Sequence, residues 1–150
     1  MKNQRLAQNT PKHGVSAIIL NHKKEVLIVQ RPSGLWEFPG GLVDERSEKD
    51  PEDQLIWQIW NDHSLHVVTL SQFATITAIS ETNESYSTEL FVFELLNGVA
   101  LKNTQAITDL AWERLKVFSK NKYWKTYVCK AQLEQCAKYP EMIPGTTSLK

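Results

Sequence analysis

The segment from residue 34 to residue 65, GLWEFPGGLVDERSEKDPEDQLIWQIWNDHSL, joins a glycine turn and an acidic loop to a helix-forming run. Carboxylates gathered in such a loop can offer anionic oxygen to a hard cation such as magnesium. In the run that follows, Gln58, Asn61 and Asp62 have the i, i+3, i+4 spacing and so share one face of a helix. Two of these side chains are amides, which are neutral and cannot act as general bases. The segment therefore has the layout of a catalytic site, but its helix has few of the carboxylates that such a site needs.

A helix is strongly signalled from about residue 51 to residue 63. Asp50 is a favourable N-cap residue, Pro51 suits the first helical position, and Asp53 places an acid in the first turn. Together with Glu48 and Glu52, these acids could instead form a metal cluster. Capping already accounts for Asp50 and Asp53, so a helix start is the simpler interpretation.

Aromatic and imidazole side chains occupy much of the rest of this helix and its end. Trp57 and Trp60 can stack on a planar ligand, but an amphipathic helix should pack at least one of them on a sheet, and Trp57 is the better candidate for a site. His63 and His66, beside Asp62, suggest a zinc site. Because a fourth ligand is not evident, surface side chains are the simpler interpretation of these histidines.

The remaining elements must position this segment. SAIILNHKKEVLIVQR predicts a hairpin, with strands near 15–20 and 25–30. The runs 66–79 and 86–95 predict further strands, and Asn97-Gly98 predicts a turn, so the sheet should be mixed or antiparallel. Near the C-terminus, Trp124, Tyr127, Val128 and Ala131 have helical spacing, and we expect this apolar stripe to pack on the sheet.

Length and charge limit the classes of protein that fit. The 150 residues, 41% of them hydrophobic, predict a single domain over 1–150, with an N-terminal arm of about 1–12 and a C-terminal tail of about 140–150. Seventeen basic and seventeen acidic side chains cancel, so we expect no nucleic-acid or membrane partner. Without a secretion signal or a membrane-spanning run, the sequence predicts a cytoplasmic protein. Cys129 and Cys136 lie roughly 10 Å apart along a helix, which predicts free thiols.

The order of these elements and the motif WEFPGG resemble the Nudix (MutT-like) family over most of the chain. The box of that family reads G-x5-E-x7-R-E-U-x-E-E-x-G-U, where U is aliphatic. The upstream match is specific, because residues of the same or similar type stand at Arg31, Trp36, Phe38, Pro39, Gly40, Gly41, Val43 and Asp44. The resemblance implies an α/β fold, a Nudix-like α/β/α sandwich with a mixed central sheet. It also implies hydrolysis of a diphosphate that links a nucleoside to another group, with magnesium or manganese as cofactor.

The box itself departs from the family pattern. With Ser64-Leu65 aligned to G-U, Trp57-Gln58 stand at R-E and Asn61-Asp62 at E-E, and the loop is about two residues too long. The first glutamate position falls on Ser47 or Glu48. The resemblance therefore implies that the catalytic positions are Gln58, Asn61, Asp62 and Glu48, with weak or no metal binding at Asp62 and Glu48. Asp62 can equally be a solvated acid near a helix C-terminus.

The resemblance also implies a set of substrate-binding residues: Arg31, Trp36, Phe38, Gly40, Gly41 and Trp57. We expect Gln58, Asn61 and Asp62 to face one groove, with Arg31 and Trp36 at its rim. The alternative for Arg31 and Trp36 is a surface cation–π contact.

Three functions agree with these observations. The first is a protein that binds a nucleotide or a nucleoside-diphosphate-linked metabolite, with hydrolysis weak or lost. The second is an active magnesium-dependent hydrolase that uses carboxylates of the lengthened loop. The third is a structural or protein-interaction domain. The replaced carboxylates favour the first function and leave open whether the chain is an enzyme; a homodimer is compatible with all three.

Overall fold

A computed structural model of the chain describes residues 10–120 and 123–145. One sheet has the order β3-β2-β1-β6-β5, while β4 pairs with β1 and β7 pairs with β2. The strands are β1 (Lys12–Leu20), β2 (Val26–Gln30), β3 (Trp36–Glu37), β4 (Gly40–Leu42), β5 (His66–Ile79), β6 (Ser85–Asn97) and β7 (Asp109–Glu113). β1 and β6 run parallel and the hairpin β1–β2 is antiparallel, so the predicted mixed sheet is confirmed.

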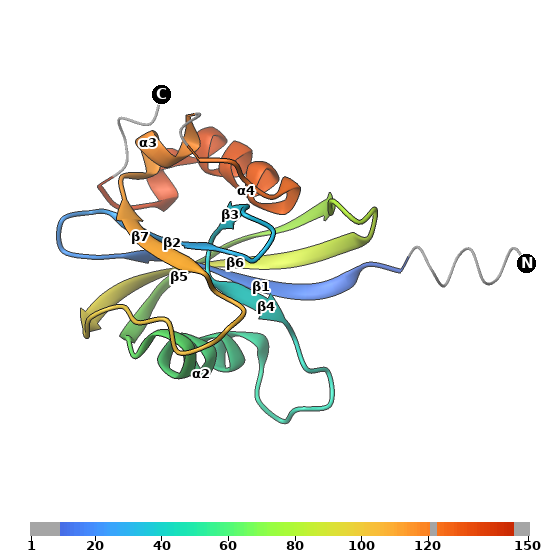
Figure 1. Cartoon of the computed structure of the whole chain (residues 1–150), viewed down its shortest axis with the longest axis horizontal. Coiled ribbons are helices and arrows are strands. Elements are labelled where there is room, and N and C mark those ends of the chain that lie inside the picture. Colours follow the sequence, from blue (N-terminus) through green and yellow to red (C-terminus); the bar gives the residue numbers. More distant parts are fainter. Residues whose placement is uncertain (1–9, 121–122, 146–150) are drawn as a thin grey trace, which may run out of the picture.

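Helices cover both faces of this sheet, which confirms the α/β/α sandwich (Figure 1). On one face lies α2 (Pro51–His63); on the other lie α3 (Leu115–Ser119), α4 (Tyr127–Lys138) and a short 3-10 helix, η1 (Pro140–Met142). Successive side chains of β1 point to opposite faces of the sheet, as in any strand. Val15 and Ile19 pack in the cluster beneath α2, whereas Ile18 and Leu20 pack in the cluster beneath α4. None of the helices in the described part of the chain is long and apolar enough to cross a bilayer.

The helix α2 begins and ends where the sequence predicts. The Asp50 side chain accepts a hydrogen bond from the Asp53 N–H at 2.9 Å, and Ser64 ends the helix in the left-handed conformation. The prediction for His63 is wrong, because this side chain is buried. Its Nδ1 lies 2.8 Å from the Leu101 carbonyl oxygen. This residue therefore ties the end of α2 to the loop after β6.

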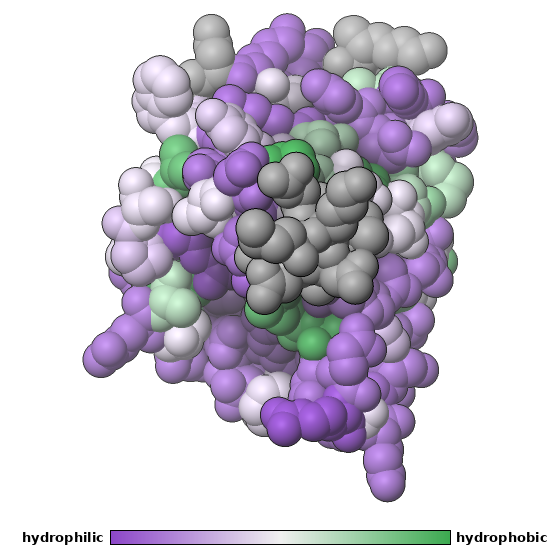
Figure 2. Space-filling view, turned by 90° about the vertical axis from the view of Figure 1, so that its right-hand side faces the viewer, coloured by the Kyte–Doolittle hydropathy of each residue, from purple (hydrophilic) through white to green (hydrophobic). Residues whose placement is uncertain are grey.

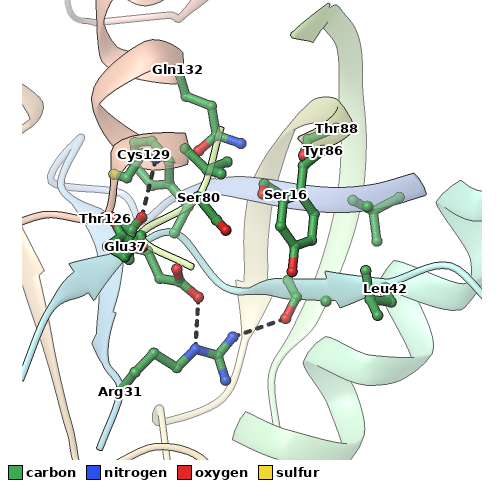
Figure 3. A pocket seen from close by; sticks show the side chains of 17 residues that line it. Ser16, Arg31, Glu37, Leu42, Ser80, Tyr86, Thr88, Thr126, Cys129 and Gln132 are labelled. Atoms are coloured by element: carbon green, nitrogen blue, oxygen red, sulfur yellow. Dashed lines mark hydrogen bonds and ion pairs between the residues drawn. The ribbon is translucent and has the colours of Figure 1, made fainter. Parts of the chain in front are cut away.

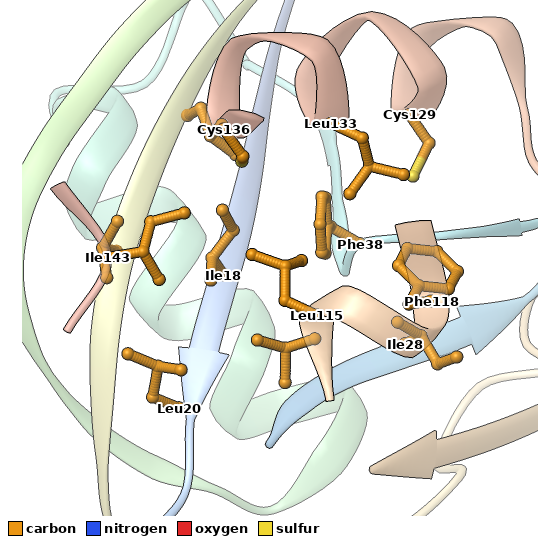
Figure 4. Packing of buried hydrophobic residues seen from close by; sticks show 13 residues of the cluster. Ile18, Leu20, Ile28, Phe38, Leu115, Phe118, Cys129, Leu133, Cys136 and Ile143 are labelled. Atoms are coloured by element: carbon orange, nitrogen blue, oxygen red, sulfur yellow. The ribbon is translucent and has the colours of Figure 1, made fainter. Parts of the chain in front are cut away.

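The stripe predicted for the C-terminal helix is wrong. Trp124 is 80% exposed and Tyr127 is 54% exposed. Thr126 caps α4, so Trp124 precedes the helix and cannot extend its apolar face. The buried stripe of α4 consists of Cys129, Gln132, Leu133 and Cys136. Figure 4 shows Cys129, Leu133 and Cys136 of this stripe in the cluster between α4 and the sheet.

The two cysteines of this stripe are free and fully buried. Burial raises the pKa of both thiols, that of Cys136 to about 12. Thiols in this state are packing residues rather than nucleophiles. Beyond α4 the chain continues to pack as far as Ile143, which is fully buried in the same cluster. The expected arm falls mostly on residues outside the described part of the chain.

Candidate functional site

Gly40 and Gly41 begin the strand β4 and pair with β1, so the turn expected at these glycines is extended backbone instead. Gly40 has no room for a side chain. A Cβ at Gly40 would lie 2.0 Å from the carbonyl oxygen of Val15. Glycine is therefore required here for close backbone approach. The close approach fixes the Gly40 carbonyl group between the sheet and α2.

Two side chains donate hydrogen bonds to the Gly40 carbonyl oxygen. Gln58 Nε2, from α2, lies at 2.7 Å, and Arg31 Nη2, from the end of β2, lies at 3.1 Å. Because a carbonyl oxygen only accepts, the Gln58 amide must present its NH2 group to it. Arg31 also pairs through Nε with Glu37 at 2.6 Å (Figure 3). The structure therefore joins Gln58 and Arg31 at one backbone oxygen.

A pocket of about 270 Å³ opens on the α4 side of Gly40 and Gly41 (Figure 3). Four of the predicted substrate-binding residues line it: Arg31, Phe38, Gly40 and Gly41. Other walls come from distant parts of the chain, including the β5–β6 turn, β6 and the first turns of α4. The polar residues among them include Glu37, Glu81, Tyr86, Thr88, Thr126 and Gln132. The end of the molecule at which the β5–β6 turn projects is mostly hydrophilic (Figure 2).

A second pocket, of about 450 Å³, lies between the acidic loop and α2. Trp57 and Gln58 line it, and it shares Val15 and Leu42 with the pocket on the α4 side. Trp57 is 54% exposed, so its ring is accessible from solvent. The two pockets are neighbours across β4, the strand that carries Gly41.

Other predicted site residues lie elsewhere. Among the described residues, Asn61, Asp62, Glu48 and Trp36 line neither pocket. Asn61 Nδ2 donates to Asp62 Oδ1 at 3.1 Å, so these two side chains bind each other. Trp36 packs edge-on against Tyr123 with ring centroids 5.2 Å apart, in the cluster beneath α4. The structure thus separates Trp36 from the rim at which the sequence places it.

The residues at the box positions do not fit a magnesium ion. Magnesium prefers anionic oxygen ligands, but Gln58 turns its NH2 group toward Gly40 and Asp62 accepts from Asn61. Within residues 10–120 and 123–145, no three histidine, cysteine, aspartate or glutamate side chains are placed to hold one metal ion. The alternative cluster of loop acids is also dispersed, because Asp50 caps α2 and Glu52 accepts from the Thr69 hydroxyl at 3.0 Å.

His13 holds the acidic loop to the sheet. Its Nδ1 lies 2.8 Å from Glu45 in the loop, and its Nε2 lies 2.5 Å from Glu89 in β6. Burial acts to lower the pKa of the His13 imidazole, but the hydrogen bonds with Glu89 and Glu45 outweigh it and raise the pKa above the ordinary value. The loop is therefore fastened by a cation between two carboxylates.

Sequence reasoning missed the residues at the α4 end of the pocket. Glu81, in the β5–β6 turn, accepts a hydrogen bond from the Tyr127 N–H at the start of α4. Gln132 lies one turn beyond the N-terminal turn of α4, is 1% exposed and lines the pocket. The signal was a polar residue within the stripe Cys129, Leu133 and Cys136. Glu81 has no local signal, because its partner lies 46 residues away.

Comparison with known proteins agrees with this geometry. No protein-family model matches the chain. Nudix hydrolase 2 of Arabidopsis thaliana is 28% identical over 97 residues, an alignment that covers 59% of this chain and 33% of that protein. The chain thus spans about a third of the length of this relative.

Solved structures match over nearly the whole chain. An ADP-ribose pyrophosphatase from Streptococcus suis has a TM-score of 0.63 at 22% identity, covering 85% of this chain and 88% of that one. The Nudix domain of Shewanella oneidensis NrtR, complexed with ADP-ribose, has a TM-score of 0.69 at 18% identity, covering 93% and 97%. The chain therefore has the Nudix fold, and the resemblance to the Nudix family is confirmed.

Proposed function

We propose that the protein binds a nucleotide or a nucleoside-diphosphate-linked metabolite and hydrolyses it weakly or not at all. The observation that carries this proposal is the pair of donors on the Gly40 carbonyl oxygen, Gln58 Nε2 at 2.7 Å and Arg31 Nη2 at 3.1 Å. Hydrogen bonds of the protein itself hold Gly40 against α2 and so help to shape the pocket beside it.

The ligand would lie across β4. Its ring system would occupy the pocket on the α4 side, and its diphosphate would pass over Gly41, which has no side chain to obstruct it. The attached group would reach the second pocket, where Trp57 offers a stacking surface and Lys49 a positive charge. The shared walls of the two pockets support this placement, and ADP-ribose, with which a structural neighbour is complexed, is a ligand of the proposed class.

Weak turnover follows from the side chains at the box positions. An amide cannot remove a proton from water, and the loss of general-base action costs about 100-fold to 10,000-fold in rate. The loss of metal stabilisation adds several kcal/mol to the barrier. These two effects together place hydrolysis far below ordinary enzymatic rates.

An active hydrolase would need the loop acids as metal ligands. Glu45 is instead paired with His13, and Glu52 accepts from Thr69, so each would have to leave its present partner. Glu48 is exposed and lines neither pocket among the described residues. These contacts favour binding over turnover.

Calorimetry of the purified protein with a nucleotide panel tests the proposal, each titration being done with and without magnesium or manganese. We expect saturable heat of binding in the absence of metal, little change when metal is added, and no release of phosphate. Turnover at about 1 per second or faster would overturn the proposal. In that case Glu45, Glu48 and Glu52 would become the leading candidates for metal ligands.

A further inference from the structure

The α4 end of the pocket contains a buried hydrogen-bond donor that the described chain leaves unused. Gln132 is 1% exposed, and its Nε2 atom has no hydrogen-bond partner among the residues that the structure describes. The side chain extends from α4 toward the pocket (Figure 3). A buried NH2 group without an acceptor destabilises the folded protein. An acceptor atom supplied from outside would relieve that cost.

Neighbouring polar groups at this end already have partners. The Thr126 hydroxyl accepts from the Cys129 N–H at 3.2 Å, and the Glu81 carboxylate accepts from the Tyr127 N–H. Ser80 Oγ accepts from backbone N–H groups of its own turn. Gln132 is therefore the group here that a ligand atom would satisfy.

The charges around Gln132 favour a neutral acceptor over an anion. Glu81 and Glu37 both line the pocket, and the Arg31 guanidinium is already paired with Glu37. An anionic oxygen placed beside Gln132 would meet the Glu81 carboxylate, and Arg31 is the only cationic side chain among the described residues that line this pocket. A carbonyl oxygen carries no such penalty. The walls formed by Phe38 and Tyr86 suit a planar ring.

We propose that Gln132 selects a ring that carries an exocyclic oxo group, such as an oxopyrimidine or an oxopurine, by donating its Nε2 hydrogen to the ring carbonyl oxygen. This inference rests on the proposed function and specifies the base. The corresponding amino-substituted ring would turn an NH2 group toward the NH2 group of Gln132. Two facing donors cannot pair, so the site would bind that ring more weakly.

The proposal also predicts an effect without ligand. Gln132→Leu removes the unpaired donor from the apolar stripe of α4, so the ligand-free variant should unfold at a higher urea concentration than the natural protein. A glutamine with a purely structural hydrogen bond would behave in the opposite way. Gln135→Leu, on the same helix and half-buried, is the matched control and should show no such rise.

The experiment compares matched ligand pairs by calorimetry: UDP with CDP, and IDP with ADP, since each pair differs in an oxo or an amino group. We expect the natural protein and Gln135→Leu to prefer the oxo member by about tenfold or more. Gln132→Leu should bind the two members within about threefold of each other while unfolding later in urea.

Equal affinity within each pair for the natural protein, a preference for the amino member, or a lower urea midpoint for Gln132→Leu would each overturn the inference. If the nucleotides bind without this discrimination, the proposed function still holds. If all four fail to bind, the proposed function falls together with the inference.

Discussion

The two sides of the Gly40–Gly41 segment of β4 use polar side chains in opposite ways. On the α2 side, Gln58 donates to Gly40 and Asn61 donates to Asp62, so the amides of the box helix are bound to the protein itself. On the α4 side, Gln132 is more deeply buried than either and its NH2 group lacks a partner among the described residues. On the α2 side the amides form internal hydrogen bonds, whereas on the α4 side the buried Gln132 NH2 group has no partner among the described residues.

This difference supports the proposal that the base of the ligand binds on the side where the box helix does not lie. A satisfied amide contributes modestly to folding, while an unsatisfied buried amide destabilises the fold. A ligand acceptor would relieve this cost for the unpaired Gln132 amide, whereas Gln58 and Asn61 already have partners. The predictions below act on one side at a time and are ordered by the size of the expected effect.

Gly40→Ala should have the largest effect, because this residue is shared by both sides. Its Cβ would lie 2.0 Å from the Val15 carbonyl oxygen and 2.9 Å from the Ser16 Cα, which are backbone atoms that cannot yield without moving the sheet. We expect a loss of about 3 kcal/mol or more in the free energy of unfolding, measured by urea denaturation.

Gly41→Ala is the control for that variant. Its Cβ would meet the Gln58 side chain at 3.2 Å, and a side chain can shift. If Gly41→Ala lowers the free energy of unfolding as much as Gly40→Ala does, the close approach of Gly40 to β1 is not what makes the substitution destabilising.

Gln58→Glu should remove the hydrogen bond from α2 to the Gly40 carbonyl oxygen. A carboxylate cannot donate to the Gly40 carbonyl oxygen, so the variant should lose about 1–3 kcal/mol of stability. With Asn61→Glu added, two new carboxylates would share one helical face with Asp62, and magnesium should raise the thermal midpoint of the double variant. Turnover should stay poor, because Trp57 and the long loop still depart from the box.

Gln58→Met is the matched control, since it removes the donor without adding charge. Its thermal midpoint should not respond to magnesium. A natural protein whose midpoint already rises with magnesium in the absence of nucleotide would contradict the description of this side as occupied by internal hydrogen bonds.

His13→Gln should give a smaller, pH-dependent effect. Because its pKa is raised in the folded protein, the charged His13 stabilises the fold below the ordinary pKa of 6.5, and this contribution is lost as the pH rises through the higher folded value. The stability of the natural protein should therefore fall relative to His13→Gln as the pH rises from below 6.5 through the higher folded pKa.

Urea midpoints measured across this range provide the test. The exposed His22, in the β1–β2 turn, supplies the control variant His22→Gln. If both variants follow the same pH curve, the pairing of His13 with Glu45 and Glu89 does not stabilise the loop.

Trp57→Ala should have the smallest effect on folding, within about 0.5 kcal/mol, because the ring is 54% exposed. Its effect should fall on ligands that extend into the second pocket. We expect affinity for ADP-ribose to drop by about threefold to tenfold and affinity for ADP to change less.

Trp60→Ala is the matched change, since Trp60 is 49% exposed and stacks on His66 at 4.5 Å. Trp60 does not line the pocket beside Gln58 among the described residues. Equal losses of ADP-ribose affinity for the two variants would remove Trp57 from the proposed site.

Much of the fold follows from local signals in the sequence. The N-cap, the proline and the acids of residues 50–53 define the start of α2, and the polar turn between two apolar runs defines the β1–β2 hairpin. The short elements β7 and α3 escaped prediction, because five residues carry too little periodicity to distinguish a strand or a helix from a loop. The stripe of α4 was misplaced because Trp124 has an apolar ring at helical spacing yet precedes the helix.

The sequence by itself determined the chemical types at the candidate site: glycines at 40 and 41, an arginine at 31, and amides in place of two box carboxylates. Only the tertiary structure decided what these groups do. Gln58 meets Gly40 across 18 residues, and His13 meets Glu89 across 76. Local patterns register the spacing of neighbours along the chain, whereas a hydrogen bond depends on which distant backbone or side chain the fold brings within about 3 Å. For the same reason, only the packing of α4 on the sheet reveals Gln132 as a buried donor that faces a pocket.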